Sequence, residues 1–234
     1  MVVASVNYSF VALVDISFRT LQPVFLSTPI AFGGLGLDPP VIGTIMSFFG
    51  ILNGVFTVFC FTRLTDWIGV KGVFLMGITA AIPCFALFPV INHLARSSIE
   101  IGEGLGAVVW AAVGLQVVMA VLYCSSYGTS ALKELNCLWI CFLPLSFSGA
   151  VFIFIAAAAP NKASLGATNG LAQLSVSIVR AVGPAAVSSM YSLSIDKDHH
   201  YMNGGLVYYA TLALSLASVW VGSLLPKHPW KDTN

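Results

Sequence analysis

The sequence carries very little charge. Only 8% of its 234 residues are Asp, Glu, Lys or Arg, whereas 58% are hydrophobic, and the mean hydropathy is +0.91. A water-soluble domain usually has about a quarter charged residues, so this chain has too few to cover a surface in water. The ten basic and nine acidic residues are scattered singly and form no basic patch for nucleic acid. The composition therefore indicates an integral membrane protein that binds no nucleic acid.

Groupings of catalytic or metal-binding residues are also scarce. The five cysteines mostly interrupt apolar runs, and neither Cys137 nor Cys141 has a histidine nearby to complete a metal site. His199 and His200 lie beside aspartates in a polar stretch that a solvated loop explains better than a metal site. No nucleophile, base and orienting acid can be assembled from the chain. We therefore expect no enzyme, no metal site and no cofactor.

Apolar runs of about 20 residues, the length of a helix that crosses a bilayer, account for most of the chain. The alternating pattern of a membrane β-barrel is missing, so the sequence predicts an all-α, polytopic transmembrane helical bundle in the lipid bilayer. The connections, including 62–72 and 95–104, are too short to hold a soluble domain. The seven runs cover residues 5–31, 40–61, 72–94, 105–127, 137–158, 168–193 and 205–225.

The distribution of Lys and Arg distinguishes seven crossings from six, because cytoplasmic loops carry an excess of positive charge. Seven crossings place four basic residues on each side and give no bias. If 105–127 and 137–158 count as one crossing, Arg63, Lys71, Lys162, Lys227 and Lys231 oppose Arg96 and Lys197. This distribution favours six crossings with both ends cytoplasmic. The seventh apolar segment then belongs to an insertion at about 120–145, either a re-entrant hairpin or retained non-coding sequence.

One polar stripe lies within the run 168–193. At 100° per residue its members share an arc of roughly 80° on a helix. An arginine at the middle of a membrane helix costs about 2.5–3.5 kcal/mol on insertion scales, which implies an aqueous cavity or a buried partner. The stripe consists of Asn169, Gln173, Ser177 and Arg180.

The run 5–31 carries a second polar stripe. Asp15, Arg19 and Gln22 share an arc of roughly 60°, and Asp15 and Arg19, four residues apart, can neutralise each other on one helix. A static pair that holds the bundle together is the alternative explanation of these charges. We interpret both stripes, together with the weaker candidate Asn53, as the lining of a pathway for a solute and a coupling ion.

Residues 63–71, RLTDWIGVK, resemble the cytoplasmic loop signature of the major facilitator superfamily of transporters, G-x-x-x-D-R-x-G-R-K. Asp66, Gly69 and Lys71 fit this signature, whereas its first glycine and its first arginine are replaced. The resemblance implies a gating loop in which Asp66, with Arg63 and Lys71 beside it, holds the cytoplasmic face closed. Plain anchoring of helix ends at the membrane surface is the alternative.

Two longer segments resemble the zinc-induced-facilitator-like branch of that superfamily. Residues 20–47 are similar to its seventh helix and the following loop, and residues 160–185 to the junction of its tenth and eleventh helices. The resemblance implies that residues 1–234 form the C-terminal six-helix half of a twelve-helix carrier, with 120–145 as an insertion. The partner of this half would be the missing N-terminal half or a second copy of the chain.

The resemblance also implies a mechanism. Two halves rock around a site at mid-membrane and give alternating access, as in secondary active transport of a small-molecule substrate, coupled here to protons, in the plasma or vacuolar membrane. Arg180 would hold an anionic group or a gating carboxylate, Asp15 would accept a proton, and the amides would orient the solute. The alternative is a non-transporting membrane protein, either a truncated product or an interaction partner of a complete carrier, because one half alone encloses no cavity.

Overall fold

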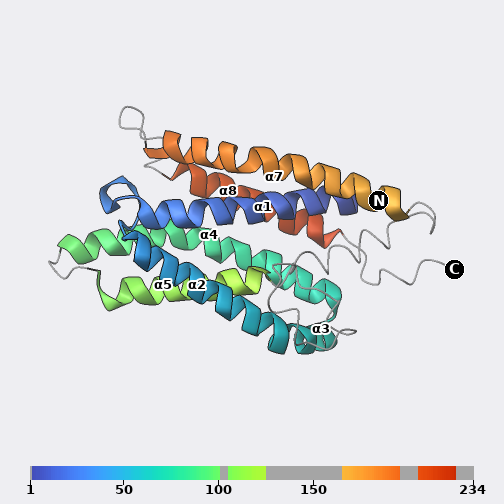
Figure 1. Cartoon of the computed structure of the whole chain (residues 1–234), viewed down its shortest axis with the longest axis horizontal. Coiled ribbons are helices and arrows are strands. Elements are labelled where there is room, and N and C mark those ends of the chain that lie inside the picture. Colours follow the sequence, from blue (N-terminus) through green and yellow to red (C-terminus); the bar gives the residue numbers. More distant parts are fainter. Residues whose placement is uncertain (1, 101–104, 125–164, 196–204, 225–234) are drawn as a thin grey trace.

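The computed structural model describes residues 2–100, 105–124, 165–195 and 205–224 (Figure 1). These residues are almost entirely helical and contain no strand. Among them, six helices are long and apolar enough to cross a membrane. The predicted all-α polytopic bundle is therefore confirmed. The run 137–158, most of the insertion at 120–145, Cys137, Cys141, His199 and His200 lie outside the described residues.

The long helices alternate in direction. Figure 1 shows α1, α4 and α7 running one way and α2, α5 and α8 the other, so that α5 runs toward the end of the bundle from which α7 starts. This alternation is the one that six crossings require. The elements are α1 (Val2–Ser27), the 3-10 turn η1 (Ile30–Phe32), α2 (Pro39–Phe56), the π-helical η2 (Thr57–Phe61), α3 (Thr62–Ile68), α4 (Val70–Glu100), α5 (Ala107–Cys124), α7 (Leu165–Ile195) and α8 (Leu206–Ser223).

Two connections are more helical than the sequence predicts. The stretch 62–72, predicted as a loop, contains the helix α3 and the start of α4, which are separated by Gly69 with a φ of 81°. Likewise α4 continues through most of 95–104 as far as Glu100. Polar residues mark the membrane surface but do not by themselves end a helix. At Gly69, a left-handed backbone that favours glycine ends α3.

The connection between α1 and α2 forms a loop, as its glycines and prolines predict. Gly33 and Gly36 adopt φ values of 96° and 64°, which side chains with a Cβ rarely adopt. Gly34 packs against the carbonyl of Thr28, where a Cβ would collide. Pro39 then stands at the first position of α2, where the missing N–H costs nothing and the ring presets the helical φ.

α1 lies at the centre of the bundle and packs along α7 and α8. Gly183 of α7 allows a close approach, because a Cβ there would lie only 2.6 Å from Cγ2 of Ile16. On the opposite side an aromatic cluster joins α1, α4 and α8. Phe88 stacks on Tyr208 with ring centroids 5.5 Å apart and meets Phe25 edge-on at 5.0 Å. The rings on this side of α1 belong to the buried core of the bundle.

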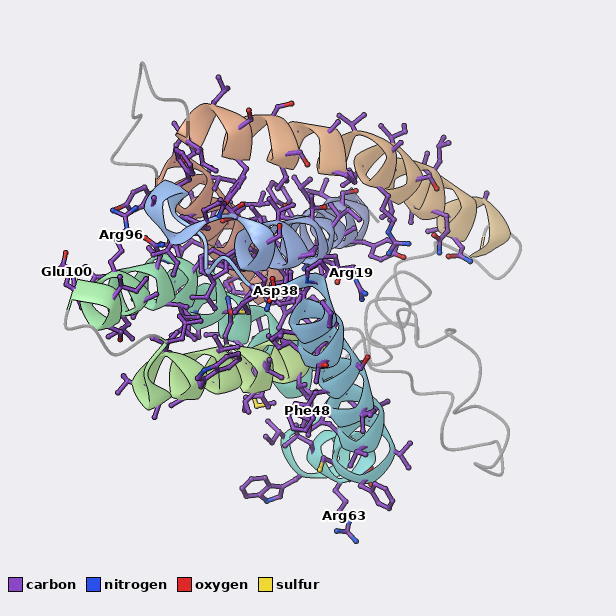
Figure 2. All side chains as sticks on the ribbon, turned by 60° about the vertical axis from the view of Figure 1, so that its left-hand side comes forward. Arg19, Asp38, Phe48, Arg63, Arg96 and Glu100 are labelled. Carbon is purple, nitrogen blue, oxygen red and sulfur yellow. The ribbon has the colours of Figure 1, made fainter. Side chains whose placement is uncertain are left out.

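α2 is the least covered of the candidate membrane helices. None of the residues in its most apolar window is buried, against about half in α1 and α4. Large apolar side chains such as Phe48 and Ile51 are more than half exposed, and Figure 2 shows α2 slanting away from the other helices toward α3. α7 is also sparsely covered. In a bilayer such faces contact lipid or another membrane polypeptide.

Candidate functional site

A cavity of about 270 Å³ lies between α1, α2 and α5. Most of its wall is aromatic or aliphatic, and both of its polar side chains come from α1. The volume falls just below the range of about 300–1,000 Å³ that is common for ligand pockets, so the cavity suits a small solute. It is lined by Phe18, Arg19 and Gln22 of α1, Met46 and Phe49 of α2, and Val117 and Ala120 of α5.

Asp15 and Arg19 form the ion pair that their spacing predicts. Nε of Arg19 donates to both carboxylate oxygens of Asp15 at 3.0 Å. The Asp15 side chain is 5% exposed and that of Arg19 54%, and of the two only Arg19 lines the cavity. Both residues belong to the candidate span Val6–Ser27. Figure 2 shows Arg19 near the crossing of α1 and α2.

Gln22 is the second polar side chain of the cavity. It is 2% exposed, and its Oε1 accepts no hydrogen bond from the described part of the chain. A buried acceptor without a partner costs about 1–3 kcal/mol, and most buried polar atoms in folded proteins avoid this cost. A donor group on a bound solute would remove the cost.

The polar residues of α7 lie apart from this cavity. Asn169 is exposed, Gln173 and Arg180 are partly buried, and none of the three is among the residues that line the cavity. α7 is nevertheless packed along α1. The structure therefore places the two predicted stripes on neighbouring helices, and of their members Arg19 and Gln22, both from the α1 stripe, line the cavity.

Asn53 of α2 is partly buried and also lies outside the cavity lining. Its backbone carbonyl accepts a hydrogen bond of 2.8 Å from Oγ1 of Thr57. Thr57 begins the π-helical segment η2, and such segments occur frequently at functional sites. The Asn53 backbone therefore contributes a hydrogen bond at the junction between α2 and η2.

The segment 63–71, predicted as a gating loop, makes a contact with a helix that is distant in sequence. Arg63 and Asp66 are exposed on α3, whereas Nζ of Lys71 donates a hydrogen bond of 3.0 Å to the carbonyl of Ser223. Ser223 is the last residue of α8. The positive charge of Lys71 is also stabilised there by the negative end of the helix dipole. Lys71 therefore joins the start of α4 to the end of α8.

Sequence reasoning missed a second set of contacts at the opposite end of the bundle. Nδ2 of Asn92 donates to the carbonyls of Ile30 and Gly34 at 3.2 and 2.8 Å, and Nη2 of Arg96 donates to the carbonyl of Ala31 at 3.3 Å. We call Asn92 and Arg96 the loop clamp, because both hold the α1–α2 loop against α4. Their spacing of four residues on one helix was the signal available in the sequence.

Gln116 and Tyr123 of α5 were also missed. Nε2 of Gln116 donates to the carbonyl of Cys84 in α4 at 3.3 Å, and the hydroxyl of Tyr123 donates to the carbonyl of Val11 in α1 at 3.3 Å. All four residues are buried. These bonds fix α5 against its neighbours and so hold one wall of the cavity in place.

The described residues contain no cluster of three or more His, Cys, Asp or Glu that could hold a metal ion. Their charged groups within the candidate spans occur near α1's middle, on α7 and at helix ends. The site combines one ion pair, the amide of Gln22 and apolar side chains, which can bind and orient a solute.

Comparison with known proteins gives one informative similarity. The chain is 24% identical, over 233 residues, to the major facilitator superfamily multidrug transporter mfsB of Aspergillus fumigatus, and the alignment covers 95% of this chain. The chain spans 34% of that relative's length. No family model and no solved structure matches the chain. The six apolar helices and this similarity describe an integral, multi-pass membrane protein that resembles a membrane transporter of the major facilitator superfamily.

Proposed function

We propose that this chain is part of a major facilitator superfamily carrier that moves a small solute across the membrane by secondary active transport. The observation that carries the proposal is the cavity beside α1, where the Asp15–Arg19 pair and Gln22 meet an apolar wall. Intramembrane charges are expensive and usually mark a transport pathway. The similarity to a multidrug transporter along nearly the whole chain supports the same class of function.

The six described spans act in this proposal as the C-terminal half of the carrier. The opposing half is an N-terminal six-helix unit or a second copy of the chain. The sparse covering of α2 and α7, which lie beside α1, supports this arrangement, because a second bundle would cover these faces and close the pathway. The branch near the zinc-induced-facilitator-like carriers belongs to the proposal through the segments 20–47 and 160–185.

The ion pair supports the proposed coupling to protons. A proton on Asp15 removes the negative charge that Arg19 now balances, and the guanidinium then gains capacity for another anion. The charged or titratable groups on adjacent helices include Arg180 of α7 and Tyr123 and Cys124 of α5. Arg180 provides a second positive charge for an anionic group or a gating carboxylate.

Alternating access requires contacts that differ between two states. At one end of the bundle the loop around Arg63 and Asp66 contributes Lys71, which binds the end of α8. At the other end the loop clamp holds the α1–α2 loop. In the proposed cycle, one set of contacts breaks as the cavity opens to that side of the membrane.

Transport by the full-length protein in proteoliposomes tests the proposal. We expect an imposed pH gradient to drive accumulation of a small organic solute, and Asp15→Asn to abolish the dependence on the gradient. Asp38→Asn is the matched control, because Asp38 is exposed and its side chain caps no helix. A folded protein that transports no member of a broad solute panel would instead support the non-transporting partner.

A further inference from the structure

Only part of the hydrogen-bonding capacity of the Arg19 guanidinium is satisfied within the described residues. Asp15 accepts hydrogen bonds from Nε alone, and neither Nη group donates a hydrogen bond to the described part of the chain. Arginine presents its N–H donors as a planar fork, and the pair of Nη groups at its end matches the two oxygens of a carboxylate. Asp15 binds the guanidinium at Nε, which leaves both Nη groups available, and the side chain that carries them lines the cavity.

Gln22 requires a hydrogen-bond donor from the solute, whereas Arg19 requires an acceptor. Its Oε1 is buried and lacks a donor within the described residues. Gln22 follows Arg19 by three positions on α1, which places the two side chains about 5–6 Å apart at Cβ. A single small solute can therefore reach both, provided that it carries an acceptor for Arg19 and a donor for Gln22.

The remaining wall favours an aromatic ring. Phe18 and Phe49 meet edge-on with ring centroids 6.3 Å apart, and Met46 lies beside them in the lining. Aromatic rings and thioether sulfur both contribute to ring binding beyond the burial of apolar area. A volume of about 270 Å³ accommodates one ring with its substituents more readily than a drug-sized molecule.

We propose that this cavity binds a small, single-ring aromatic carboxylate that carries a hydrogen-bond donor on the ring. The carboxylate accepts from both Nη groups of Arg19, the ring donor binds Oε1 of Gln22, and the ring packs on Phe18, Phe49 and Met46. This inference names the substrate class of the proposed carrier and rests on that function for transport. Binding itself does not depend on it.

Equilibrium binding to the full-length protein in nanodiscs, with no gradient, tests the substrate class. The probe is para-hydroxybenzoate, compared with benzoate, para-hydroxybenzamide, cyclohexanecarboxylate and benzyltrimethylammonium. We expect the hydroxybenzoate to bind about tenfold to a hundredfold more tightly than the uncharged amide, since a charge-assisted bidentate bond is lost. Equal affinity for acid and amide, or preference for the cation, would overturn the inference.

Variants assign the binding to its residues. Arg19→Gln should weaken para-hydroxybenzoate binding about tenfold to a hundredfold and leave para-hydroxybenzamide binding within about twofold. The hydroxybenzoate affinity of Arg19→Lys should lie between those of the unmodified protein and Arg19→Gln, because lysine retains the charge and loses the planar pair of donors. Gln22→Leu should remove the preference for hydroxybenzoate over benzoate. Glu100→Gln, at the exposed end of α4, is the control and should change neither affinity.

The outcomes separate this inference from the proposed function. Carboxylate binding without transport would support the inference and remove the carrier function. Transport of other solutes, together with no preference for carboxylates in the binding assay, would overturn the inference and leave the function intact. If Arg19→Gln fails to fold, the comparison of acid and amide on the unmodified protein still decides the matter.

Discussion

Two buried amides on neighbouring helices have different surroundings. Asn92 of α4 is 9% exposed and donates to two backbone carbonyls, while Gln22 of α1 is 2% exposed and its Oε1 has no partner within the described residues. The amide nitrogen of Asn92 uses both of its donors and holds a loop in place. The second amide retains hydrogen-bonding capacity beside a cavity. Gln22 thus differs from Asn92 in combining an unused buried acceptor with a place in the cavity wall.

The two sides of α1 repeat this contrast. Toward α4 and α8 it packs through aromatic rings such as Phe25 and Phe88, and toward α7 it closes on Gly183. Toward α2 and α5 it presents Arg19 and Gln22 to the cavity. The same helix therefore packs through rings and a close glycine contact on one side and presents polar side chains on the other, and the following substitutions measure the difference.

Gly183→Leu should have the largest effect on stability. Even a Cβ at this position would lie 2.6 Å from Ile16, and overpacking typically costs about 1–3 kcal/mol. Gly170→Leu on the same helix is the control, because a Cβ there meets nothing within 4 Å. Thermal unfolding followed by fluorescence-detected size exclusion provides the comparison, and equal midpoints for the two variants would contradict the close approach of α1 and α7.

Asn92→Leu should be the next most destabilising change. It leaves the carbonyls of Ile30 and Gly34 without their donor, which costs about 1–3 kcal/mol for buried groups. The same unfolding assay measures it, and Asn92→Asp serves as a second variant that preserves size but not the donor. Unchanged stability in both variants would show that the loop clamp does not hold the α1–α2 loop.

Lys71→Met should cost less, about 0.3–1 kcal/mol, because its bond to the Ser223 carbonyl lies at a solvent-accessible helix end. The loss should shrink further in high salt, which screens exposed charges. Lys71→Arg should retain most of the stability. A salt-independent loss larger than that of Asn92→Leu would contradict a surface role for this contact.

Gln22→Leu should have the smallest effect on stability. It is also the most informative variant, because it tests whether Gln22 is a binding or a structural residue. Removing an unsatisfied buried oxygen costs little or is slightly favourable, so the unfolding midpoint should stay within the error of the unmodified protein while solute affinity falls. If Gln22→Leu destabilises the protein as much as Asn92→Leu, the contrast between the two amides is wrong and Gln22 is structural.

Much of the architecture could be predicted because it depends on local pattern. Runs of apolar residues long enough to cross a bilayer predict the spans, and the separation of Asp15 and Arg19 by four residues predicts their ion pair, which forms. Helix ends were less predictable. The polar stretch around Arg63 forms α3, since charged residues are compatible with a helix that continues beyond the membrane surface.

The sequence by itself determined a multi-pass helical membrane protein with charged residues inside its spans, because a bilayer leaves few ways to satisfy backbone groups. Only the tertiary structure decided which polar residues meet. The contact of Lys71 with Ser223 spans 152 positions, and that of Gln116 with Cys84 spans 32. Such pairings depend on how whole helices pack, as does the grouping of α1, α2 and α5 around one cavity, and no local periodicity encodes them.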